Sequence, residues 1–129
     1  MAQKFDIHRI IALFDKSAVV GKTEILEIDE IESRGFYKLK CTLIPSKFQL
    51  DIKFIKTETE LLYAYQLYEK EGIARWDNEP HYPKLKNYPH HFHSKNKVSS
   101  SALTGMPLQD ITKVLEIIPD IMASIQEER

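Results

Sequence analysis

The sequence has little of what secreted, membrane-spanning or disordered chains depend on. Its single cysteine, Cys41, excludes an internal disulfide, the cross-link that stabilises many small secreted domains. The N-terminal residues lack the apolar core of a signal peptide, and no run approaches the roughly 18 apolar residues of a membrane span. With four glycines and 43% hydrophobic residues, the composition is that of a folded chain. We therefore expect a cytoplasmic protein that does not enter a membrane and that buries Cys41 as an inert thiol.

The 129 residues are enough for one domain with one hydrophobic core. Alternating apolar residues around Tyr37–Leu43 and Phe48–Phe54 predict two strands joined by a short turn, which is an antiparallel hairpin. Apolar residues spaced by three and four predict a helix near each end of the chain. The expected helices span 4–16 and 107–126, and the expected strands span about 23–32, 36–44, 48–56, 61–69 and 72–77. The expected fold class is α+β, an antiparallel β-meander sheet of four to five strands with an N-terminal and a C-terminal helix.

Charge is divided unevenly along the chain. Residues 24–34 contain five carboxylates and one arginine, whereas residues 75–97 contain five cations and two carboxylates. The second segment is therefore the one suited to an anionic ligand.

Four of the five histidines, His81, His90, His91 and His93, lie in that basic segment. Imidazole titrates near neutral pH, so the cluster is a candidate acid–base, phosphate or metal site. Pro80, Pro83 and Pro89 disfavour regular helix here, and we expect residues 78–100 to form an irregular loop over the sheet.

Extended backbone would place His91 and His93 on one side of the chain and His90 on the other. Two imidazoles on one side can serve as general acid and general base, and with His81 or Asp77 they could instead bind a divalent metal. Asp77 could orient a histidine and Arg75 could hold a phosphate. The simpler alternative is that Asp77 forms a turn and pairs with Arg75.

Aromatic residues are interleaved with these charges, as in surfaces that stack the bases of single-stranded RNA. Core packing explains Trp76 and Phe92 equally well. Tyr88, beside a proline in the loop, is the aromatic residue that we assign to the site.

Two stretches, Arg75-Trp76-Asp77-Asn78-Glu79-Pro80-His81 and Tyr88-Pro89-His90-His91-Phe92-His93, resemble the signature of TumE-type toxins from bacterial and archaeal toxin–antitoxin modules. The likeness extends more loosely over residues 33–93. The chain departs from the usual pattern at Tyr82 and Phe92, where the family commonly has a histidine and a lysine. The resemblance implies a small cytoplasmic protein encoded with an antitoxin, for which RNA cleavage is often supposed.

The first hypothesis is a metal-independent endoribonuclease toxin that needs no cofactor. His81 and either His91 or His93 would exchange protons, Asp77 would orient an imidazole, and the substrate would contact a second group of residues. That group is Arg75, Lys84, Tyr88 and His90. The alternatives are a binding module that docks nucleic acid or the antitoxin without catalysis, and a metal-dependent hydrolase that binds its ion through His91 and His93. The expected partners are the cognate antitoxin and RNA, and a homodimer is a further candidate assembly.

Overall fold

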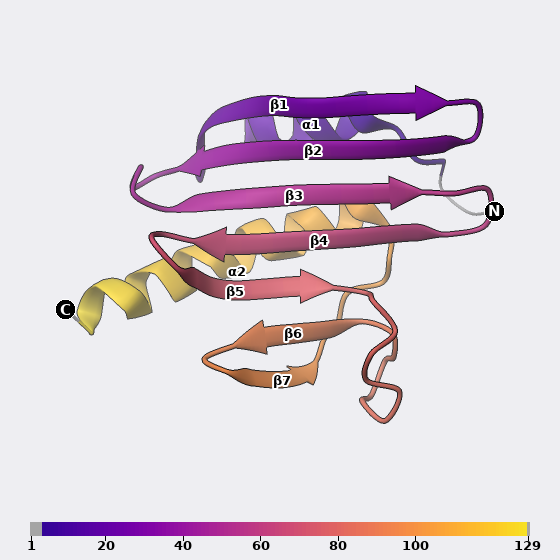
Figure 1. The fold of residues 1–129 in the computed structure, drawn as a ribbon. Coiled ribbons are helices and arrows are strands. Elements are labelled where there is room, and N and C mark those ends of the chain that lie inside the picture. Colours follow the sequence, from indigo (N-terminus) through magenta and orange to yellow (C-terminus); the bar gives the residue numbers. More distant parts are fainter. Residues whose placement is uncertain (1–3, 129) are drawn as a thin grey trace.

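The computed structural model describes residues 4–128 and contains two helices and one sheet (Figure 1). The elements in order are α1 (Ile7–Lys16), β1 (Val20–Ile31), β2 (Arg34–Leu43), β3 (Gln49–Lys56), β4 (Leu61–Tyr68), β5 (Gly72–Asp77), β6 (His91–Ser94), β7 (Lys97–Ser100) and α2 (Pro107–Glu127). The sheet order β1-β2-β3-β4-β5-β6-β7 follows the sequence, and every neighbouring pair is antiparallel. The predicted α+β meander is confirmed, but the sheet has seven strands instead of four to five.

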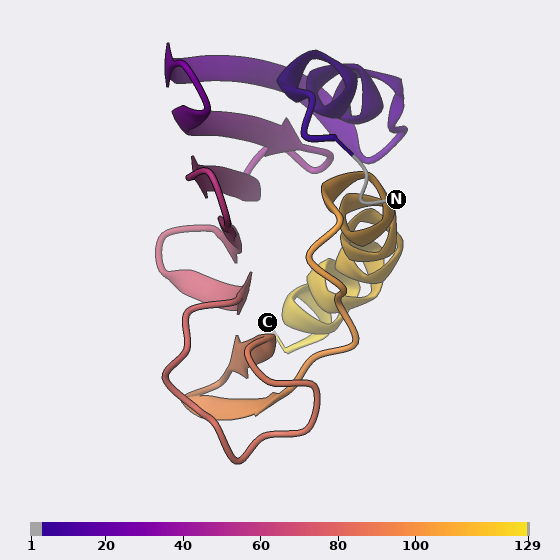
Figure 2. The same ribbon diagram turned by 90° about the vertical axis from the view of Figure 1, so that its right-hand side faces the viewer.

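Both helices cover the same face of the sheet, so the fold has two layers and one open sheet face (Figure 2). Alternation along the strands places apolar side chains toward the helices. Leu39, Leu50, Tyr65 and Trp76 are buried there with Ile111 of α2. The open face carries the residues between them, and the candidate site lies on that face.

Helix α1 begins at Ile7, later than the predicted start at residue 4. The side chain of Asp6 accepts hydrogen bonds from the backbone N–H groups of His8 and Arg9. An aspartate that satisfies the free donors of the first turn fixes the start of a helix.

Strand β1 begins at Val20, three residues before the predicted start, and is interrupted by irregular pairing with β2 between Val20 and Lys22 and between Ile25 and Glu27. These irregularities explain why its sequence alternates poorly. Cys41 lies in β2 and is fully buried, where burial raises the pKa of its thiol to about 12.

The expected loop over residues 78–100 is wrong for its last ten residues, which form the β6–β7 hairpin. Lys95 and Asn96 connect the strands with φ angles of 50° and 64°. Two left-handed residues match the twist of a tight hairpin, but Asn-Gly is the usual sequence signal for such a turn and it is missing here. Phe92 packs against Trp76, with ring centroids 5.0 Å apart, and ties the hairpin to the core.

Helix α2 starts at Pro107, as its sequence predicts. The buried carboxylate of Asp110 accepts hydrogen bonds from the backbone of Thr104 and Gly105 and so fixes the chain that leads into the helix. Within residues 4–128, no helix combines the length and the apolar character needed to cross a bilayer.

Candidate functional site

The candidate site lies on the open face of the sheet, where β5 and β6 pair. The antiparallel register sets Asp77 opposite His91 and Arg75 opposite His93. Residues directly opposite each other share a sheet face, so four polar side chains meet at one place. The predicted separation of His91 and His93 from His90 follows from the same alternation.

Asp77 is the centre of the cluster and is only 3% exposed. Its Oδ1 accepts from His91 Nε2 at 2.8 Å and from the backbone N–H of Glu79 at 3.1 Å. Its Oδ2 lies 2.8 Å from Arg75 Nε and 3.5 Å from His93 Nε2. A buried carboxylate needs such partners to offset its lost hydration. The sequence-based alternative, in which Asp77 pairs with Arg75, is therefore part of a larger network.

His91 is buried beneath this network, with 1% exposure. Its Nε2 faces Asp77, and its Nδ1 lies 3.0 Å from the carbonyl oxygen of Pro89. Both ring nitrogens therefore meet oxygen acceptors, and neither is free to take a proton from a substrate. The geometry suits His91 to holding Asp77 in place.

His93 is the accessible imidazole, with 35% of its side chain exposed. Its Nε2 faces Asp77, and within residues 4–128 its Nδ1 has no hydrogen-bond partner. Burial lowers the pKa of His93, Asp77 opposes that effect, and the nearby His91 and Arg75 add to it. A neutral ring with a free nitrogen can accept a proton.

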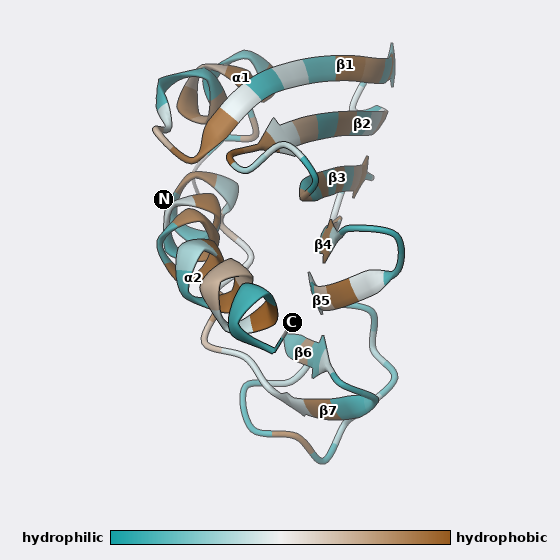
Figure 3. Cartoon of the chain, turned by 90° about the vertical axis from the view of Figure 1, so that its left-hand side faces the viewer, coloured by the Kyte–Doolittle hydropathy of each residue, from teal (hydrophilic) through white to brown (hydrophobic). Residues whose placement is uncertain are grey.

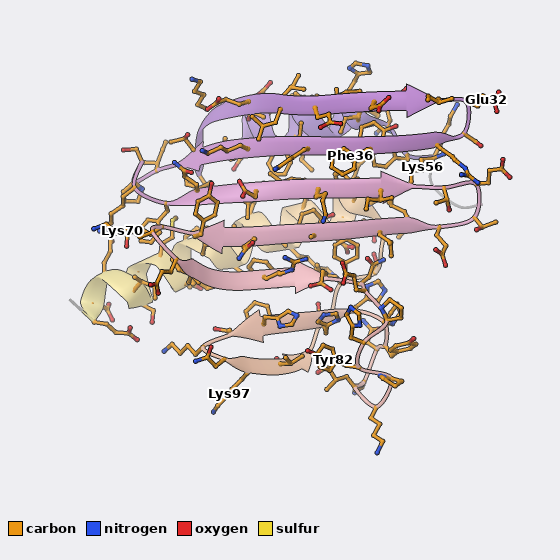
Figure 4. All side chains as sticks on the ribbon, in the orientation of Figure 1. Glu32, Phe36, Lys56, Lys70, Tyr82 and Lys97 are labelled. Atoms are coloured by element: carbon orange, nitrogen blue, oxygen red, sulfur yellow. The ribbon has the colours of Figure 1, made fainter. Side chains whose placement is uncertain are left out.

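Tyr82 covers the two histidines from the loop between β5 and β6. Its ring makes edge contacts with His91 and His93, with centroids 4.9 and 6.0 Å apart. Figure 4 shows the labelled Tyr82 among the rings beside β6. Tyr88, and not Tyr82, was the aromatic residue predicted for the site, because only the course of an irregular loop decides which ring folds back onto the sheet.

Beside His93, an open groove of about 390 Å³ runs along β5 and the β6–β7 hairpin. Its lining includes Arg75, His93, Lys95 and Lys97. Arg75 uses Nε for Asp77 and has no other hydrogen bond within the described part of the chain, so its terminal nitrogens can bind an anion.

The remaining predicted site residues lie apart from Asp77. His81 is exposed, pairs with Glu79 at 2.8 Å and touches the edge of Tyr82 at a centroid distance of 6.4 Å. The ion-pair cluster of Asp77 therefore includes Arg75, His91 and His93 but not His81. Lys84 and Tyr88 are both exposed in the loop.

His90 belongs to a different environment on the helix side of the sheet. Its Nδ1 is 2.7 Å from the Tyr63 hydroxyl, and the two rings stack with centroids 5.8 Å apart. A Cβ atom on Gly105 would lie 3.4 Å from the His90 ring. Burial lowers the pKa of His90. These contacts give His90 a packing role beside Tyr63.

The site also has the donor types of a metal centre. One ligand atom each from Asp77, His91 and His93 lie within 4.8 Å of one another. The Arg75 guanidinium, however, occupies one oxygen of Asp77 and places a positive charge beside the three donors. Charge repulsion therefore opposes a divalent ion unless Arg75 moves away.

Comparisons with known proteins identify the family. No curated protein and no solved structure matches the chain. The sequence model of the family described as Toxin TumE matches residues 10–129. The resemblance seen at the two histidine-containing stretches therefore extends over nearly the whole chain, which belongs to the TumE family of toxins from toxin–antitoxin modules.

Proposed function

We propose that this TumE-family toxin is a metal-independent endoribonuclease in which His93 is the general base. The observation that carries the proposal is the buried Asp77 carboxylate, which orients Arg75 and His93 side by side on the open sheet face. His93 supplies a free ring nitrogen, and Arg75 supplies unused guanidinium donors. Phosphodiester cleavage needs a base of the first kind and a charge stabiliser of the second kind.

In the proposed reaction, Nδ1 of His93 takes the proton of a ribose 2′-hydroxyl, and the 2′-oxygen attacks the adjacent phosphorus atom. Arg75 stabilises the charge that develops on the phosphoryl oxygens. The bond to the 5′-oxygen breaks, and His81, whose ring also contacts Tyr82, gives that oxygen a proton. The products are a 2′,3′-cyclic phosphate and a 5′-hydroxyl. Tyr82 offers its ring to a base of the substrate.

His91 and Asp77 are positioning residues in this scheme, because both are buried and their polar atoms already have partners within the protein. Lys84 and Tyr88 are exposed in the loop between β5 and β6, and they would contact nucleotides of the RNA farther from the cleaved bond.

The test is incubation of the purified protein with total cellular RNA in EDTA. Cleavage to cyclic phosphate ends is expected, and His93→Gln should reduce its rate by about 10²-fold or more. His8→Gln is the matched control, because His8 is an exposed histidine of α1. Intact RNA with and without added metal would exclude nuclease activity and leave a binding role.

A metal-dependent hydrolase is the second candidate, supported by the closeness of Asp77, His91 and His93. It predicts cleavage only with added zinc or manganese, 3′-hydroxyl and 5′-phosphate ends in the products, and loss of bound metal in His91→Gln. Persistence of cleavage in EDTA contradicts it.

A further inference from the structure

Strand β1 is a long, uncovered edge of the sheet. It has 12 residues, more than any other strand, and pairs only with β2 (Figure 1). An edge strand exposes unpaired backbone N–H and C=O groups, and proteins usually shorten, charge or cover such strands. The outer part of β1 is not covered, because every residue from 25 to 34 is exposed.

Apolar side chains are concentrated on this edge. Ile25, Leu26, Ile28 and Ile31 are 54%, 48%, 39% and 70% exposed, and they are half of the large exposed hydrophobic residues in the described part of the chain. Figure 3 shows hydrophobic and hydrophilic bands alternating along β1. Clustered exposed apolar side chains mark an interaction surface.

Acidic side chains lie between these apolar residues. Glu24 is 3.8 Å from Lys22, and Glu30 lies near Tyr37, whose pKa is raised by burial and by that carboxylate. Glu27 lies opposite Lys38 of β2, but neither Glu27 nor Asp29 has an ion pair within residues 4–128. A second copy of β1 would bring acidic residues against acidic residues, which is unfavourable across paired strands. The complementary partner is an extended segment with basic and apolar residues.

We propose that β1 is the docking edge for a basic, apolar segment of the cognate antitoxin, which adds to the sheet as an eighth strand. Backbone hydrogen bonds would provide affinity, while the isoleucines and carboxylates select the side chains of the partner. Because the chain belongs to a toxin family, we expect an antitoxin partner. The proposed binding site of this partner is the surface of β1.

This contact is separate from the proposed nuclease site. Five strand spacings, roughly 24 Å, lie between β1 and β6. Substitutions in β1 should therefore change neutralisation by the antitoxin without changing the toxicity of the chain alone. Antitoxin binding and RNA cleavage are measured separately, so either proposal can fail while the other holds.

The experiment measures binding of the full chain to the antitoxin encoded beside it by titration calorimetry. The double variant Ile25→Lys/Ile28→Lys should raise Kd by about tenfold or more. Glu27→Lys/Asp29→Lys, which leaves the apolar side chains intact, should also raise Kd, and the effect should shrink at high salt. Ile117→Lys is the matched control, because Ile117 is 43% exposed on α2.

Equal Kd values for the wild type and both β1 variants overturn the proposal, as does an equal loss in Ile117→Lys. Thermal unfolding of each variant checks that the fold is intact. Sedimentation of the chain alone adds a separate test: a dimer that Ile25→Lys/Ile28→Lys dissociates would assign the edge to a second copy and overturn the antitoxin assignment.

Discussion

At the scale of single residues, Asp77 determines how the site is built. Its two oxygens face Arg75, His91, His93 and a backbone N–H group. One buried carboxylate therefore sets the direction of an arginine and of a half-buried imidazole at the same time. Removing the negative charge of Asp77 should shift the pKa of His93 while the sheet stays folded.

The first prediction concerns the pKa of His93. Burial holds it below 6.5, so the ring is neutral above that pKa and becomes protonated as the pH falls through it. On the acid side of its pH profile, RNA cleavage should therefore not decline until the pH falls below 6.5. Asp77→Asn should lower the pKa of His93 further, because the carboxylate favours the charged ring. NMR titration of the ring C–H signals measures both values.

Asp120→Asn is the control for this titration, since Asp120 is an exposed carboxylate of α2. A His93 pKa above 6.5 in the wild type, or an upward shift in Asp77→Asn, would contradict the description of the site. Cleavage that already fails at pH 7 would contradict the role of His93 as a base.

Several site residues could be predicted because strand periodicity alone positions them. Arg75, Asp77, His91 and His93 alternate along two strands that pair, so their side chains reach one face. Periodicity says nothing about an irregular loop. Tyr82 and His81 are placed by the course of residues 78–90, which depends on contacts distant in sequence, such as the Asn87 side chain on the backbone of residues 101 and 103.

At the scale of elements, the β6–β7 hairpin was the part of the fold that the sequence concealed. Its strands are four residues each, and its turn uses Lys95 and Asn96 in left-handed conformations without a glycine. A non-glycine residue in this region costs energy, less for asparagine than for lysine. The hairpin persists because Phe92 packs on Trp76 and because His91 and His93 bond to Asp77.

A matched pair of asparagines tests this view of the loops. Asn87 and Asn96 both have φ of 64°. Asn96→Gly should stabilise the protein by about 0.5–1 kcal/mol, because glycine is favoured in the turn. Asn87→Gly should destabilise it by about 1–3 kcal/mol, because its amide donates to the carbonyl oxygens of Ser101 and Leu103. Urea unfolding measures both, and shifts of the same sign would contradict this assignment.

At the scale of the whole molecule, the two layers leave one sheet face packed against the helices and the other face open. The helix-covered face holds the core, and the open face holds a row of charges that crosses the sheet. Lys38 of β2 and Lys53 of β3 are direct cross-strand partners, and both line a hollow of about 160 Å³ with Arg75 and with Asp51, whose carboxylate accepts a hydrogen bond from the Tyr68 hydroxyl. Like charges in this arrangement lower the stability of the fold. An anion that lies across the two lysines would be attracted by both and would relieve their repulsion.

The last prediction follows from that cost and rests on the proposed action on RNA. Lys53→Gln should raise the free energy of unfolding slightly, since it removes repulsion with Lys38, and yet weaken RNA binding. The slope of log K against log salt should fall by about 1, the change expected for one lost phosphate contact. Lys113→Gln, on the helix layer, should alter neither quantity. Unchanged RNA affinity in Lys53→Gln would show that RNA does not cross the lysine pair, and the open face would then need a different ligand.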